Sequence, residues 1–187
     1  HLKFQVINKE FTLFLISRII FTSGMKMVPV LLGWYLYGLT GSKLVLGILG
    51  LSEVVPHFIG ITAGVKVDSS LKRTLILTCL AAYFLITLTF ASVTSGHIFS
   101  FSDTAKVYTI YGLVGFTGLV RAYISPSFSA IIAQIVRPDE LVKAASLNSM
   151  SWLIAAVAGP LIAGFMVGYW EVSISFIIIS IMMIITL

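Results

Sequence analysis

The feature that most constrains this chain is a set of long stretches that contain no charged side chain. Residues 74–94, 144–170 and 172–187 contain no Asp, Glu, Lys or Arg. Only 10% of all residues are charged, whereas a soluble globular domain has about 25%. So few charges cannot cover a water-facing surface, and a helix that crosses a bilayer needs roughly 20 apolar residues. The sequence therefore predicts an integral membrane protein.

Six apolar segments are separated by short connections rich in Gly, Ser, Asp or Pro, which are typical of turns. The segments do not alternate between polar and apolar residues, as the strands of a membrane β-barrel do. We therefore expect an all-α membrane protein, a single domain made of six transmembrane helices. The expected spans are residues 11–39, 44–65, 71–94, 105–135, 140–168 and 171–187.

The distribution of Lys and Arg predicts the orientation of the chain, because cytoplasmic loops carry an excess of both. Of the 12 basic residues, seven fall on one side of the expected membrane and two, Lys43 and Lys106, on the other. Arg18, Lys26 and Arg121 lie within spans. We therefore expect a cytoplasmic amino terminus in a multi-pass protein of the cell (inner or plasma) membrane.

The same patterns argue against several other classes of protein. The formal charge of +5 is scattered between apolar runs and forms no basic face, so nucleic acid is not an expected partner. The chain has no metal-spacing cluster of His, Cys or acids, and we expect no metal and no cofactor. An intramembrane enzyme needs a nucleophile and a base on facing helices. Because the chain offers few such pairs, an enzyme is not expected.

Ionisable residues at membrane depth are costly unless they are paired or hydrated, so each is a candidate functional residue. Counting about 1.5 Å per residue places Lys26, Glu53 and Arg121 in the middle third of the membrane. His57 follows Glu53 by one helical turn and should share its face. Arg18 lies closer to the cytoplasmic edge, where a long side chain can reach water.

Two interpretations of these residues remain open. In the first, a hydrated cavity uses Glu53 and His57 to carry protons, while Lys26 and Arg121 tune them or hold an anionic substrate. In the second, Glu53 forms a buried ion pair with Lys26 or Arg121 that only fixes the register of the helices.

Small residues along the fifth expected span are typical of close helix contacts in membranes. Ala155, Gly159 and Ala163 form one stripe, which Gly164 continues. Pro160 removes a backbone donor in the middle of the span and should bend it. The pattern predicts a packed bundle of helices.

Several motifs resemble those of the major facilitator superfamily. The segment Gly64-x-x-x-Asp68-x-x-x-Lys72-Arg73 resembles the family's loop 2–3 signature, G-x-x-x-D-R-x-G-R-R/K. Residues 33–56, 118–126 and 141–149 are similar to the enterobactin-exporter and macrolide-efflux branch. Residues 155–164 resemble the antiporter motif G-x-x-x-G-P-x-x-G-G, with alanine at two glycine positions. The loop signature differs from the usual form at Ser69 and Leu71.

The resemblance implies a transporter of twelve helices, of which this chain covers the first six. It assigns Asp68, supported by Lys72 and Arg73, to a cytoplasmic latch, and Arg121 to proton coupling. It also implies that the bent helix around Gly159 and Pro160 packs against the other half.

The resulting functional expectation is a proton-coupled exporter of a small amphipathic or anionic organic molecule. Its expected partners are the lipid bilayer, the small-molecule substrate, protons, and the missing carboxyl-terminal half or a second copy. The chain begins at His1 rather than Met and ends within an apolar run, so we expect part of a longer protein. The alternative is a truncated or regulatory six-helix membrane protein that does not transport by itself.

Overall fold

The computed structural model describes residues 9–59, 72–96 and 101–186, with the side chains of all of these except His57, Ile59 and Lys72. Helices and short connections account for the described residues, which include no strand. The prediction of an all-α protein is therefore confirmed. The elements are α1 (Lys9–Thr40), α2 (Lys43–Ile59), α4 (Lys72–Ser95), α5 (Asp103–Ile135), the 3-10 turn η2 (Pro138–Glu140), α6 (Leu141–Tyr169) and α7 (Val172–Ile185).

Four of the described helices are long and apolar enough to cross a membrane, namely α1, α4, α5 and α6. The described part of α2 has 17 residues and α7 has 14. At about 1.5 Å per residue these two are shorter than the roughly 30 Å hydrocarbon core. The chain is therefore a multi-pass membrane protein, and the count of six spans stays a prediction.

The helix ends follow from local sequence. Helix α1 stops at Gly41, whose φ of +64° suits glycine, and the Gly41 amide donates to the Tyr37 carbonyl at 2.8 Å. Ser102 caps the amino end of α5, and its hydroxyl accepts from the Ala105 amide at 3.3 Å. Pro138 occupies the first turn of η2, where its missing N–H has no cost. These residues set the short connections that return the chain across the bundle.

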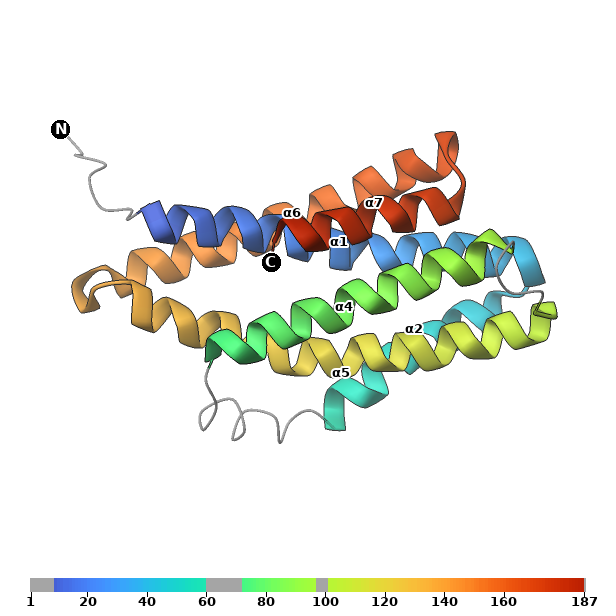
Figure 1. Ribbon diagram of the computed structural model, residues 1–187, viewed down its shortest axis with the longest axis horizontal. Coiled ribbons are helices and arrows are strands. Elements are labelled where there is room, and N and C mark those ends of the chain that lie inside the picture. Colours follow the sequence, from blue (N-terminus) through green and yellow to red (C-terminus); the bar gives the residue numbers. More distant parts are fainter. Residues whose placement is uncertain (1–8, 60–71, 97–100, 187) are drawn as a thin grey trace.

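Helix α1 packs against α2, α5, α6 and α7, so it is the element around which the site is assembled. Figure 1 shows α6 and α7 along α1 on one side of the bundle, and α2, α4 and α5 on the other. An aromatic cluster joins these two groups. The Phe21 ring of α1 lies 5.6 Å from Tyr83 of α4 and 5.8 Å from Phe128 of α5, both in edge-to-face contact.

Helices α4 and α7 are joined by a buried polar contact. The Ser180 hydroxyl of α7 donates to the Thr87 hydroxyl of α4 at 2.9 Å. Both side chains are almost fully buried, and the Thr87 hydroxyl also bonds to the Phe84 carbonyl at 2.9 Å. The Ser180 hydroxyl is also 2.9 Å from the Phe176 carbonyl, so both hydroxyls have partners inside the bundle, which lipid could not supply.

Candidate functional site

The structure brings two of the predicted site residues into direct contact. Glu53 of α2 forms an ion pair with Arg121 of α5 through Oε1 and Nη1. The two side chains are only 23% and 24% exposed, respectively. Isolated charges at membrane depth would each cost several kcal/mol, and pairing offsets part of that cost.

Gly118 allows α5 to approach α2 closely at this ion pair. A Cβ added at Gly118 would overlap the Glu53 carbonyl oxygen and would lie 3.5 Å from the Pro56 Cβ. Arg121 lies three residues further along α5, on the same side of the helix. The Tyr111 hydroxyl of α5 donates to the Val45 carbonyl of α2 at 3.1 Å. This hydrogen bond joins the two helices closer to their amino-terminal ends. Backbone packing therefore places the start of the Arg121 side chain next to α2, and the ion pair with Glu53 holds its guanidinium.

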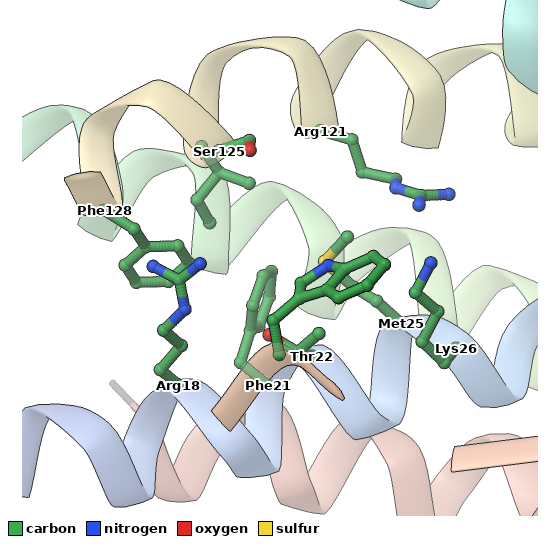
Figure 2. Close-up of a pocket in the computed structure, with 10 residues that line it drawn as sticks. Arg18, Phe21, Thr22, Met25, Lys26, Arg121, Ser125 and Phe128 are labelled. Carbon is green, nitrogen blue, oxygen red and sulfur yellow. The ribbon is translucent and has the colours of Figure 1, made fainter. Parts of the chain in front are cut away.

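A cavity of about 220 Å³ lies beside the ion pair, between α1, α5 and α6. Three basic side chains line it, Arg18 and Lys26 from α1 and Arg121 from α5 (Figure 2). Arg18 and Lys26 are eight residues apart, a spacing that places both toward one side of α1. The remaining lining residues are Phe21, Thr22, Met25, Ile124, Ser125, Phe128 and Trp152.

Lys26 is positioned by α6. Its Nζ lies 5.1 Å from the centre of the Trp152 ring, a distance at which a cation and an aromatic face attract. A Cβ added at Gly159 would lie 2.7 Å from both the Lys26 Cβ and the Ser23 carbonyl oxygen. Gly159 therefore lets α6 lie directly against the backbone of α1 next to Lys26.

The other two residues of the antiporter-like motif have different surroundings. Pro160 lies within α6 directly after Gly159. A Cβ added at Gly164 would have no neighbouring atom within 4 Å. Within the described residues, close packing against α1 is therefore a property of Gly159 and does not extend to Gly164.

Arg18 is buried among the described residues, and whether its side chain reaches water at the membrane edge stays a prediction. The residue is only 8% exposed, and its guanidinium carbon lies 5.1 Å from the centre of the Phe128 ring. Its Nε and Nη1 atoms are buried and have no hydrogen-bond partner among the described residues. A cation–π contact contributes about 0.5–2 kcal/mol, while burial of an ion costs several kcal/mol. The aromatic ring alone therefore leaves the charge of Arg18 incompletely compensated.

A second cavity, of about 270 Å³, lies between α1, α2, α4 and α5. Glu53 lines this cavity together with Tyr83, Thr117 and mostly apolar side chains. Met25 of α1 lines both cavities. Each member of the ion pair therefore lines a different cavity. Glu53 lines the more apolar cavity, and Arg121 lines the more basic one.

Several predicted residues fall at the limits of the described chain. Gly64 and Asp68 lie outside the described residues. Lys72 begins α4, and Arg73 follows it with an exposed side chain. His57 lies in α2, one turn after Glu53, and its side chain is outside the description.

Three residues that contact or position the predicted cations were not singled out from the sequence. Phe128 and Trp152 are aromatic residues within apolar spans, where aromatic residues are common and no pattern distinguishes these two. Gly118 lies in a segment that was noted only for its resemblance to a family. The spacing of eight residues between Arg18 and Lys26 was a usable signal, because it places both toward one side of a helix.

The described residues contain no group of three or more His, Cys, Asp or Glu side chains that could hold a metal ion. The arrangement is suited to binding a charged solute inside a membrane bundle, with one ionisable carboxylate tied to a neighbouring arginine.

Searches of curated proteins and of solved structures found no match to the chain. The sequence model of the Major Facilitator Superfamily matches residues 14–187, which include all the residues of the site. The match extends over nearly the whole chain and agrees with its apolar helices, which fit a membrane transporter. The chain therefore belongs to the major facilitator superfamily.

Proposed function

We propose that this membrane transporter is proton-coupled and exports a small amphipathic or anionic organic molecule. The observation that carries this proposal is the Glu53–Arg121 ion pair, which joins two helices and borders a cavity on each side. An ionisable carboxylate held inside a membrane bundle is a natural site for a transported proton.

Protonation of Glu53 removes the negative charge that holds Arg121. The attraction between α2 and α5 then weakens, and the relative stability of the inward-open and outward-open states changes. A proton can shift such an equilibrium only if it binds one state more tightly than the other. The ion pair supplies that difference, provided that it is present in one state and broken in the other. His57 follows Glu53 by one turn of α2 and is a second candidate for carrying the proton.

Transport proceeds by alternating access, in which this bundle rocks within the bilayer against the carboxyl-terminal half or a second copy. In this proposal Asp68, with Lys72 and Arg73, latches the cytoplasmic side of the transporter. The segment of α6 around Gly159 and Pro160, which we expect to be bent, packs against the other half. The excess of basic residues on one side of the spans supports a cytoplasmic amino terminus in the cell membrane.

The proposed direction, export, is supported by the resemblance to the enterobactin-exporter and macrolide-efflux branch. That resemblance rests on residues 33–56, 118–126 and 141–149 and on the antiporter-like motif in α6.

The test begins with a ligand screen of the purified protein, using thermal stabilisation across siderophores, lipids, organic anions and cationic drugs. Proteoliposomes are then loaded with the best ligand, and its flux is followed with and without a pH gradient. We expect a pH gradient to drive transport against the ligand's own gradient, and a protonophore to abolish this. Flux that is indifferent to the pH gradient would contradict proton coupling. The absence of any flux would favour a non-transporting membrane protein.

A further inference from the structure

The cavity of about 270 Å³ between α1, α2, α4 and α5 opens between α1 and α2. Pro29 of α1 and Gly50 of α2 are exposed, and Gly33, Leu46 and Glu53 are half-buried. The deeper lining residues are almost fully buried, namely Val28, Leu32, Tyr83, Val114 and Thr117. A molecule that enters this cavity therefore reaches the side chains of α1 and α2 near the opening.

The lack of a side chain at Gly50 leaves part of this cavity open. The lining residues of α2 are spaced so that they share one face of the helix, namely Leu46, Leu49, Gly50 and Glu53. A Cβ added at Gly50 would have no neighbouring atom within 4 Å, whereas one added at Gly118 of α5 would overlap the Glu53 carbonyl oxygen. Helix α2 therefore packs closely against α5 but leaves free space at Gly50.

The polar side chains in the lining offer little to a charged occupant. Thr117 donates its hydroxyl to the Val114 carbonyl at 2.7 Å, and Glu53 is paired with Arg121. The Glu53 carboxylate would repel an anion, and a cation would have to compete with Arg121 for it. A buried water needs about two to four polar partners, whereas most of this lining is apolar. The cavity therefore fits a neutral apolar molecule.

The volume of the cavity sets the size of that molecule. An engineered apolar cavity of about 150 Å³ binds benzene, and this cavity is nearly twice as large. It therefore has room for about one or two aromatic rings. The Met25 thioether also lines the cavity, and thioethers make favourable contacts with aromatic rings.

We propose that this cavity binds a small neutral apolar molecule, the size of one or two aromatic rings, at a site separate from the basic cavity. Such an occupant would lie beside the Glu53 carboxylate and keep water from that side of the ion pair. This consequence for proton coupling rests on the transport function proposed above. Binding itself needs no proton gradient and is measured separately.

The probe is 3-trifluoromethyl-3-phenyldiazirine, a neutral aromatic molecule that inserts into nearby side chains on illumination. The protein is placed in phosphatidylcholine nanodiscs, and labelled residues are identified by mass spectrometry. Val28 lines the cavity and is 3% exposed, and its matched control, Val93 of α4, is 2% exposed and does not line it. Val157, which is exposed on α6, reports labelling from the lipid phase.

We expect labelling of Val28 and Leu49 to exceed that of Val93. An excess of naphthalene, at about ten times its Kd, should lower labelling in the cavity about 10-fold and leave Val157 unchanged. Labelling of Val28 and Leu49 that is no greater than that of Val93 would overturn the proposal. So would labelling that naphthalene does not reduce.

A variant that fills the cavity provides a second test. Gly50→Phe puts a ring into the free space at Gly50 and should lower labelling of Val28 about 10-fold. Ile48→Phe, the control, puts a ring on the opposite side of α2, where Ile48 is exposed, and should match the parent. Equal labelling in Gly50→Phe and the parent would overturn the proposal. If Gly50→Phe fails to fold, the naphthalene competition decides.

Two further arms distinguish other occupants. A phosphatidylcholine with a diazirine near the end of one acyl chain should label Val157 and spare Val28; labelling of Val28 would assign the cavity to lipid chains and overturn the proposal. Naphthylmethylammonium should protect Val28 less than naphthalene does, and stronger protection would make this a cation site.

The site and the transport function can fail independently. Saturable labelling of the cavity in a protein that shows no transport in proteoliposomes would refute the transport function alone. Proton-driven transport without such labelling would refute this site alone.

Discussion

The contact between Gly159 and α1 predicts a large difference between two glycine-to-alanine substitutions on the same helix. In Gly159→Ala the new Cβ would lie 2.7 Å from the Lys26 Cβ and the Ser23 carbonyl, whereas ordinary contacts begin near 3.4 Å. Helices α1 and α6 must therefore separate locally by about 0.7 Å. In Gly164→Ala, the matched control, the new Cβ would have no neighbour within 4 Å.

The magnitudes follow from two opposing effects on the free energy of unfolding. Replacing glycine by alanine within a helix stabilises it by up to about 1 kcal/mol in both variants. Overpacking, which applies only to Gly159→Ala, costs about 1–3 kcal/mol. The control should therefore be as stable as the parent or slightly more stable. Gly159→Ala should be about 1–3 kcal/mol less stable than the control.

The assay is thermal unfolding of the parent and both variants in one detergent, followed by circular dichroism. For a chain of this size 1 kcal/mol shifts Tm by about 2–4 °C, so the two variants should differ by about 2–12 °C. Because the clash involves the Lys26 Cβ, Gly159→Ala should also disturb the contact of Lys26 with Trp152. If Gly159→Ala unfolds at the same temperature as the control or above it, the close approach of α6 to α1 is wrong.

Three further substitutions test other contacts. Arg121→Gln should destabilise the protein more than the double change with Glu53→Gln, with a coupling of about 0.5–3 kcal/mol in denaturant unfolding; additive effects would refute the ion pair. Ser180→Ala should cost about 0.5–1.5 kcal/mol, and adding Thr87→Val should cost less than the sum of the separate losses; an unchanged Tm in Ser180→Ala would contradict the α4–α7 hydrogen bond. Asp68→Asn should leave the folding largely intact and shift the complete transporter toward its inward-open state; an unchanged inward-to-outward ratio in cysteine-labelling experiments would refute the latch.

The helical fold was predictable because its main cause, the long uncharged runs, can be read from the sequence. Long uncharged runs must be helical in lipid, where every backbone polar group needs an internal partner. The short connections were also readable, since Gly41 and Pro138 mark the ends of helices. Depth along each helix could be counted, which made Glu53 and Arg121 possible neighbours before their contact was known.

A cavity was predicted, but its lining was not, because depth fixes only one coordinate of a side chain. Spans that are apolar on all sides do not reveal which face meets which neighbour, so rotation about each helix axis remained open. This is why the contact of Trp152 with Lys26 and of Phe128 with Arg18 emerged only from the packed structure. The same ambiguity applies to Arg18. A position near the end of a span allows a side chain to reach water, but among the described residues the packing of α1 against α5 and α6 covers it.

In the proposed mechanism Glu53 carries the transported proton, and this role is tested by measuring proton and substrate movement together. Proteoliposomes receive a substrate gradient without a pH gradient, and internal pH and substrate content are followed for the parent and Glu53→Gln. We predict that substrate movement drives proton movement in the parent. In Glu53→Gln we predict that substrate exchange continues while proton movement and pH-driven accumulation are lost. Unchanged proton coupling in Glu53→Gln would show that Glu53 does not carry the transported proton.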